Sequence, residues 1–136
     1  MNDLLLKKLL CGGLLLVCIF SFSNCKKNNP AHQKAKEQKE LDNLKAEIVK
    51  ISVQVNCDNA ADWKFATLIN GPCYTQEYIP YSVKINEASF LEKVAVHNEK
   101  QKAFNAKWEA NINCIMLPKV PPKGVTCVDG KAKLVY

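Results

Sequence analysis

His97 is the side chain in the expected folded part of the chain that is best suited to acid–base chemistry near neutral pH. A general base or a metal ligand needs partner groups, and the sequence places no second histidine or acidic cluster at a useful spacing from it. His97 falls instead within an apolar helical stripe, with Gln101 one turn further on as its expected hydrogen-bonding neighbour. We therefore predict a histidine at the rim of the core, no catalytic residue, and a protein that is not an enzyme.

Cysteine offers three kinds of chemistry here: metal binding, lipid attachment and disulfide formation. Structural zinc sites use closely spaced cysteine pairs, and the four cysteines after residue 25 include none. We therefore predict no metal site and no cofactor. The chain holds 7 cysteines, an odd number for an exported protein.

Residues 1–24 have the pattern of an export signal. Lys7 and Lys8 precede an apolar-rich run over 9–22, which is shorter than the roughly 20 residues of a spanning helix. Cys25 follows this run and is itself followed by polar residues, which is the lipid-attachment pattern. We predict cleavage before Cys25, diacylglycerol on its thiol and acylation such as palmitate. An uncleaved spanning anchor is the alternative.

The signal peptide would remove two cysteines and the lipid would occupy a third, so an even set is left for disulfides in an oxidising compartment. This set is Cys57, Cys73, Cys114 and Cys127. An extended segment over 63–69 would separate the first two, which disfavours joining them. A hairpin of 112–117 with 125–128 would favour joining the last two. These arguments are incompatible, so the pairing stays open.

Lysine supplies all 19 basic residues of the chain, against 13 acidic ones. Nucleic-acid recognition relies on the planar fork of arginine, which this sequence lacks. We therefore expect no nucleic-acid partner. The lysine excess suits anionic lipid or a solvated surface. Lys26 rather than aspartate after Cys25 favours the outer membrane of a bacterial cell envelope over inner-membrane retention.

The first half of the mature chain should contain a tether, a helix and two strands. Residues 26–40 carry no large aliphatic side chain and suit a flexible tether, with a helix expected over 31–47. Alternating valines and isoleucines predict a strand over 49–55. Residues 57–62 suggest a turn, and 63–69 a second strand with Trp63 on one face.

The second half should supply one long helix and more strands. The segment 70–81 is expected to be irregular, with a possible short strand over 81–85. Asn86 has the features of a helix cap, and the helix should reach about Ala110. Its stripe comprises Phe90, Val94, His97, Gln101, Phe104 and Trp108.

Strand-like sequence returns over 112–117, and the segments 125–128 and 131–136 flank Asp129-Gly130, a strong hairpin signal. The predicted fold is α+β: a small antiparallel sheet of about four to five strands, one long helix packed across it, and two disulfides. The predicted organisation is a signal peptide over 1–24, a lipidated tether and helix over 25–47, and a cross-linked domain over 48–136.

The loop Gly71–Ser82 is the candidate binding segment, since it carries Tyr74, Tyr78 and Tyr81 with two prolines. Such a loop is stiff and amphipathic, which suits a protein, peptide or glycan partner. The alternative is that these tyrosines belong to the core of a small domain.

Several residue groups resemble a group of small Bacteroidota secreted proteins and lipoproteins. The resemblance covers 57–136 and lies in the four cysteines, Asp62-Trp63, Gly71-Pro72, Tyr78–Ser82 and Gly130-Lys131. It implies a two-disulfide domain and no particular activity. The leading hypothesis is an outer-membrane lipoprotein, periplasmic or surface-facing, with a non-catalytic binding or structural role. The alternative is an inhibitor or immunity protein that blocks a protease or lysozyme.

Overall fold

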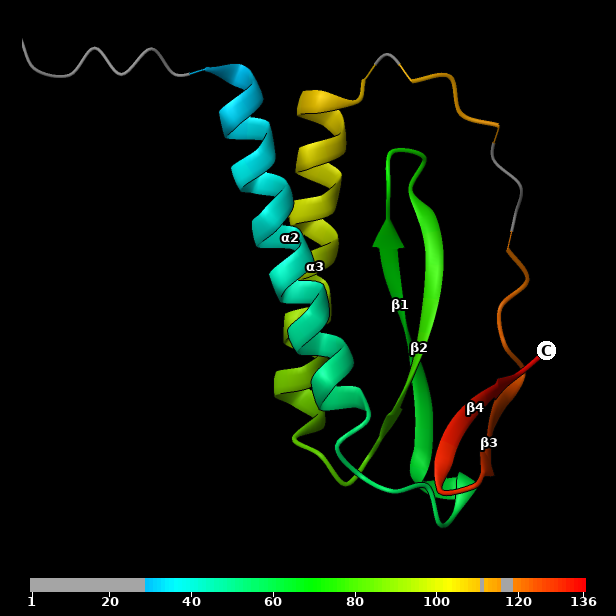
Figure 1. Ribbon diagram of the computed structural model, residues 1–136. Helices are drawn as coiled ribbons and strands as arrows, with labels where there is room; N and C mark the ends of the chain where they lie inside the picture. Colours follow the sequence, from blue (N-terminus) through cyan, green and yellow to red (C-terminus); the bar gives the residue numbers. More distant parts are fainter. Residues whose placement is uncertain (1–28, 111, 116–118) are drawn as a thin grey trace, which may run out of the picture.

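The computed structural model describes residues 29–110, 112–115 and 119–136. The predicted signal peptide over 1–24 and the predicted lipidation site Cys25 lie outside these residues. Two helices, one short 3-10 turn and two β-hairpins follow one another along the described chain (Figure 1). The protein is therefore α+β, and the prediction of one sheet of four to five strands is wrong, because the strands form two separate antiparallel pairs.

Helix α2 (Pro30–Ser52) begins where the sequence predicts a helix. The side chain of Asn29 accepts a hydrogen bond from the backbone N–H of Ala31 at 3.0 Å, and Pro30 occupies the first turn. The tether prediction for the segment up to residue 40 is therefore wrong from Pro30 onward. The helix also runs past residue 47 to Ser52, although we expected the folded domain to begin at residue 48.

The predicted strand over 49–55 is wrong, because α2 continues to Ser52. Alternation at period two suggested the strand, but Leu44, Ile48 and Ile51 are also spaced as one face of a helix. Ile48 is fully buried, and Leu44 and Ile51 pack against the core, whereas the intervening Val49 is exposed. Burial of the helical stripe decides between two patterns that the sequence satisfies equally.

The first sheet pairs β1 (Trp63–Asn70) with β2 (Thr75–Ser82). The short turn η1 (Ala60–Asp62) precedes it, and both this turn and β1 agree with the sequence prediction. The segment expected to be an irregular loop is mostly β2, so that prediction is wrong. Pro80 is tolerated within β2, because a two-stranded sheet offers edge positions at which a missing N–H does no harm.

Helix α3 (Glu87–Trp108) confirms the predicted long helix. Asn86 caps it by accepting a hydrogen bond from the backbone N–H of Ser89 at 3.1 Å. Helices α2 and α3 lie side by side over one face of the β1–β2 sheet, which we call the inner face (Figure 1). The sequence predicted one long helix packed across the sheet, whereas two helices cover it.

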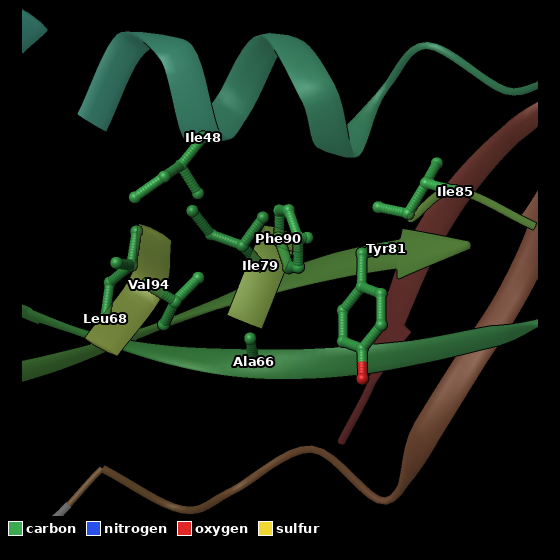
Figure 2. Close-up of a cluster of buried hydrophobic side chains, with 8 residues drawn as sticks. All are labelled: Ile48, Ala66, Leu68, Ile79, Tyr81, Ile85, Phe90 and Val94. Carbon is green, nitrogen blue, oxygen red and sulfur yellow. The ribbon is translucent and has the colours of Figure 1, made fainter. Parts of the chain in front are cut away.

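The main core lies between the two helices and the inner face, and Figure 2 shows its side chains converging from all three elements. Because strand side chains alternate, Ala66 and Leu68 face the helices, and Trp63 and Phe65 lie on the opposite, outer face. The core cluster consists of Ile48, Ala66, Leu68, Ile79, Tyr81, Ile85, Phe90 and Val94.

The second hairpin, β3 (Gly124–Val128) with β4 (Lys131–Val135), forms as Asp129-Gly130 predicts. Both turn residues have positive φ, 51° at Asp129 and 71° at Gly130, as a tight two-residue turn requires. This hairpin contacts β1 and β2 on the side away from the helices (Figure 1). The strand predicted over 112–117 is absent from 112–115, and residues 116 and 117 lie outside the described part.

Two disulfides connect elements that are distant in sequence. Cys57 pairs with Cys127, which holds the β3–β4 hairpin against the segment that follows α2. Cys73 pairs with Cys114, which joins the β1–β2 turn to the segment after α3. The two predicted disulfides are thus present, and the extended β1 does separate Cys57 from Cys73 as the sequence argument held.

Candidate functional site

The three tyrosines of the predicted binding loop do not form one surface. Tyr81 is buried in the core, where its ring packs against Phe90 with the centroids 4.8 Å apart. Tyr78 lies on the outer face and packs edge-on against Phe65, while Tyr74 is exposed in the turn before β2. The position of Tyr81 therefore agrees with the alternative interpretation of the sequence, in which the tyrosines belong to the core.

The hydroxyl of Tyr81 is satisfied inside the protein. It donates a hydrogen bond to Glu87 Oε1 at 2.8 Å, and Lys64 Nζ lies 2.9 Å from the same oxygen. Burial, together with the Glu87 carboxylate, raises the pKa of Tyr81 to about 12. The same hydrogen bonds, first from Lys64 and then from Tyr81, lower the pKa of Glu87. This arrangement fixes the start of α3 on the sheet.

His97 is fully buried on α3, and its Nδ1 has no hydrogen-bond partner among the described atoms. Burial lowers the pKa of His97, with a smaller opposing contribution from a hydrogen bond to Asn98. Gln101, the expected neighbour, donates instead to Asn105 Oδ1 at 2.7 Å. His97 therefore lies in the interior, and not at the rim of the core as the sequence predicted.

Polar side chains on the same helix bind the backbone of β1. Asn98 donates to the carbonyl of Thr67 at 2.9 Å and accepts from the N–H of Ile69 at 2.8 Å. Asn105 donates to the carbonyl of Gly71 at 2.7 Å. Side-chain amides thus take the place of a neighbouring strand along this edge, which explains why α3 carries the buried residue Asn105 and its partner Gln101.

The described residues include no cluster of three or more histidine, cysteine, aspartate or glutamate side chains able to hold a metal ion. The disulfides engage all four cysteines of the described part. A shallow depression of about 290 Å³ between α2 and α3 is crossed by an ion pair, Lys107 to Glu37 at 2.6 Å. Its charges are already matched within the protein.

A concave cleft of about 490 Å³ lies where α2 ends. Its walls are the segment after α2, the outer face of the first sheet and the turn of the β3–β4 hairpin. The described residues that line it are mainly apolar, and Lys131 is the charged one among them. They are Ser52, Val53, Val55, Asn56, Trp63, Pro80, Gly130, Lys131 and Ala132.

The walls of this cleft are fixed by covalent and hydrogen bonds. The Cys57–Cys127 disulfide holds the hairpin, and the N–H of Cys57 donates to the carbonyl of Gly130 at 2.9 Å. Trp63 is buried on the outer face and forms the floor beside Pro80. The size falls within the range of small-ligand and side-chain pockets, and the lining suits an apolar group.

Sequence reasoning missed the cleft. It placed Trp63 on a sheet face correctly, but the other walls come from segments that are distant in sequence and carry no motif. Comparisons of the chain with protein-family models, with curated proteins and with solved structures find no match. None of the described helices is long and apolar enough to span a membrane. The candidate site therefore rests on its own geometry.

Proposed function

We propose that this protein is an exported, lipid-anchored binding protein of the bacterial outer membrane, without catalytic activity, and that its partner occupies the cleft beside Trp63. The observation that carries the proposal is the cleft itself: an apolar hollow with a fixed wall in a small domain. Two disulfides that connect distant segments support residence in an oxidising compartment.

The position of the cleft along α2 supports anchoring at one end and binding at the other. Helix α2 has 23 residues and is therefore about 34 Å long. Cys25 precedes its first residue by five positions, whereas Ser52 and Val53 at its other end line the cleft. The two ends of α2 lie at opposite ends of the molecule (Figure 1), so a lipid on Cys25 would leave the cleft on the side away from the bilayer.

The cleft lining defines the chemistry of the partner. Trp63, Pro80 and Val55 offer apolar surface, and the positively charged residue Lys131 also lines the cleft. A protein or peptide that inserts an aliphatic or aromatic side chain next to a carboxylate would match both features. A purely polar glycan would leave most of the lining unmatched.

Site-specific photocrosslinking tests the binding site. Val53 and Val120 are valines of nearly equal exposure, 68% and 67%, and only Val53 lines the cleft. A benzophenone amino acid in place of Val53 should give a discrete crosslinked product in intact cells, and the same replacement of Val120 should not. The crosslink should disappear when Ala132→Trp fills the cleft. Equal crosslinking at both positions would refute the site.

Mass spectrometry of the protein from its native membrane tests the anchor. We expect the mature N-terminus at Cys25 with a diacylglycerol and an acyl chain, and both disulfides intact. A matched Cys25→Ala protein should no longer be recovered as a lipidated species. An N-terminus within residues 1–24, or an unmodified Cys25, would refute the lipoprotein assignment.

A second candidate function, an inhibitor or immunity protein against a protease or lysozyme, draws support from the β1–β2 turn. The Cys73–Cys114 disulfide holds this turn, and Tyr74 projects from it with φ of 52°. Inhibition of lysozyme or a periplasmic protease by the purified protein, reduced by Tyr74→Ala and unaffected by filling the cleft, would favour this function. A lack of inhibition at micromolar protein would exclude those targets.

A further inference from the structure

Exposed apolar side chains gather at the end of the molecule opposite the cleft. Tyr74 in the β1–β2 turn is 44% exposed, and Ile112 and Ile115 in the segment after α3 are 48% and 88% exposed. We call these three residues the apolar tip. Such high exposure of Ile115 is unusual for a large apolar side chain on a folded domain. All three residues of the tip are uncharged.

The apolar tip is held in place. The Cys73–Cys114 disulfide joins the two segments that carry it, with the Cα atoms 5.4 Å apart. Asn105 of α3 donates a hydrogen bond of 2.7 Å to the carbonyl of Gly71, which anchors the turn to the end of the helix. The tip is therefore a fixed feature of this end of the domain.

The same end of the molecule holds the start of α2. Near the end of α3, Lys107 Nζ and Trp108 Nε1 each bind a carboxylate oxygen of Glu37, at 2.6 and 2.7 Å. In Figure 1 the start of α2, the end of α3, the β1–β2 turn and residues 112–115 all lie at the top. Cys25 precedes Pro30 by five positions, a reach of at most about 18 Å.

The charges at this end suit an anionic surface. Lys26 and Lys27 directly follow Cys25 in the sequence, and Lys119 follows the segment that carries the tip. Two other lysines here form ion pairs within the protein, Lys34 with Glu109 at 3.7 Å and Lys107 with Glu37 at 2.6 Å. The unbalanced charge next to the expected lipid is thus positive, which favours anionic headgroups.

We propose that the apolar tip contacts the bilayer interface beside the lipid on Cys25, so that the domain stands on the membrane with its cleft outward. Tyrosine and isoleucine suit this interface, where an amphipathic ring and an aliphatic chain enter the headgroup boundary. A lipid chain and an apolar protein contact together give firmer attachment than either alone. This inference rests on the proposed lipid anchor.

Depth-dependent fluorescence quenching tests this orientation. The lipidated full-length protein is reconstituted into vesicles of phosphatidylethanolamine and phosphatidylglycerol that contain lipids brominated on the acyl chain. Tryptophan is introduced by Ile115→Trp at the tip or by Val128→Trp beside the β3–β4 turn at the opposite end. The parent protein, with Trp63 and Trp108, supplies the background. The mass of Cys25 is recorded for every sample.

We expect the Ile115→Trp signal to lose most of its intensity and to shift to shorter wavelength in these vesicles, with the Val128→Trp signal unchanged. If Cys25 carries lipid and neither signal is quenched, or only Val128→Trp is quenched, the orientation is wrong and the anchor stands. If Cys25 carries no lipid, both the anchor and the orientation that rests on it are wrong.

Discussion

Tyr81 and Tyr78 lie three positions apart in β2 and therefore on opposite faces of the sheet. The hydroxyl of Tyr81 bonds to Glu87 at 2.8 Å from a buried ring, and the hydroxyl of Tyr78 bonds to Gln76 at 2.9 Å in an exposed setting. Hydrogen bonds of similar length thus have different surroundings. The bond of Tyr81 is partly buried, so it is less open to competition from water than the exposed bond of Tyr78.

Replacing each tyrosine by phenylalanine should separate these settings. Tyr81→Phe keeps the ring contact with Phe90 and removes the bond to Glu87, so the free energy of unfolding should fall by about 1 kcal/mol. Tyr78→Phe should change it by less than half of that, because water replaces the lost partner. Urea unfolding measures both. An equal effect of the two substitutions would contradict the importance of burial.

His97 should make stability depend on pH. Burial, the largest influence, and nearby Lys45 lower the pKa of His97 from its ordinary 6.5, although Asn98 and Glu77 oppose this. The unfolded chain therefore binds the proton more readily, so the free energy of unfolding decreases as pH falls below 6.5 toward the pKa of folded His97. One proton gives a slope of at most about 1.4 kcal/mol per pH unit.

His97→Gln should flatten this slope between pH 7 and pH 5, whereas His32→Gln, at an exposed position on α2, should leave it unchanged. Urea unfolding at a series of pH values measures both. The carboxyl groups of Glu37 and Glu87 have a pKa lowered from 4.5. Their contribution to the free energy of unfolding is therefore lost only below the pH range in which His97 acts. A persistent slope in His97→Gln would assign the effect to another group.

At the scale of elements, the β3–β4 hairpin depends on its disulfide. A two-stranded hairpin alone is marginally stable in water. Cys57–Cys127 closes a sequence separation of 70 residues, for which chain entropy gives a stabilisation of about 4 kcal/mol. Replacing both cysteines by alanine should release the hairpin before the helices unfold.

Hydrogen exchange measures this release. In Cys57→Ala/Cys127→Ala the amides of residues 124–135 should exchange much faster, while those in the centre of α3 should keep most of their protection. The matched Cys73→Ala/Cys114→Ala protein loses the other disulfide, whose cysteines are 41 residues apart in sequence, and it should keep the β3–β4 hairpin protected from exchange. Retained protection of the hairpin in the first variant would show that packing alone holds it.

Sequence predicted those elements whose signals are local. Asn86 and the stripe from Phe90 to Phe104 identified α3, and Asp129-Gly130 identified the second hairpin. The predictions for the end of α2 and for most of β2 were wrong for a physical reason, and the possible strand over 81–85 overlapped only the last residues of β2. Their patterns fit two structures, and only pairing with β1 and burial of Ile48 decide between them.

At the scale of the whole molecule, the cleft could not be predicted because its lining residues are distant in sequence. Trp63 was placed on the correct strand, but Val53, Pro80 and Lys131 come together only after two helices, two hairpins and a disulfide have formed. Pairing of the cysteines was equally non-local. The opposite locations of cleft and apolar tip also follow from the assembled fold, since α2 spans the distance between them.

The length of the tether should govern the orientation of the whole domain. Few residues separate Cys25 from the N-cap Asn29, so the proposed lipid on Cys25 would keep the apolar tip at high effective concentration near the bilayer. Inserting twenty glycine and serine residues after Asn28 adds a coil with a root-mean-square length of about 25 Å. The domain should remain attached, but the quenching of Ile115→Trp by brominated lipid should fall markedly.

An insertion of two residues at the same position is the matched control and should leave the quenching nearly unchanged. Both proteins should still sediment with vesicles, because both retain Cys25 and the lipid proposed on it. Quenching that stays equal in the long and short insertions would show that the tip holds the bilayer by its own affinity. The short tether would then not be what orients the domain, and the cleft would face outward through the contact of Tyr74, Ile112 and Ile115 alone.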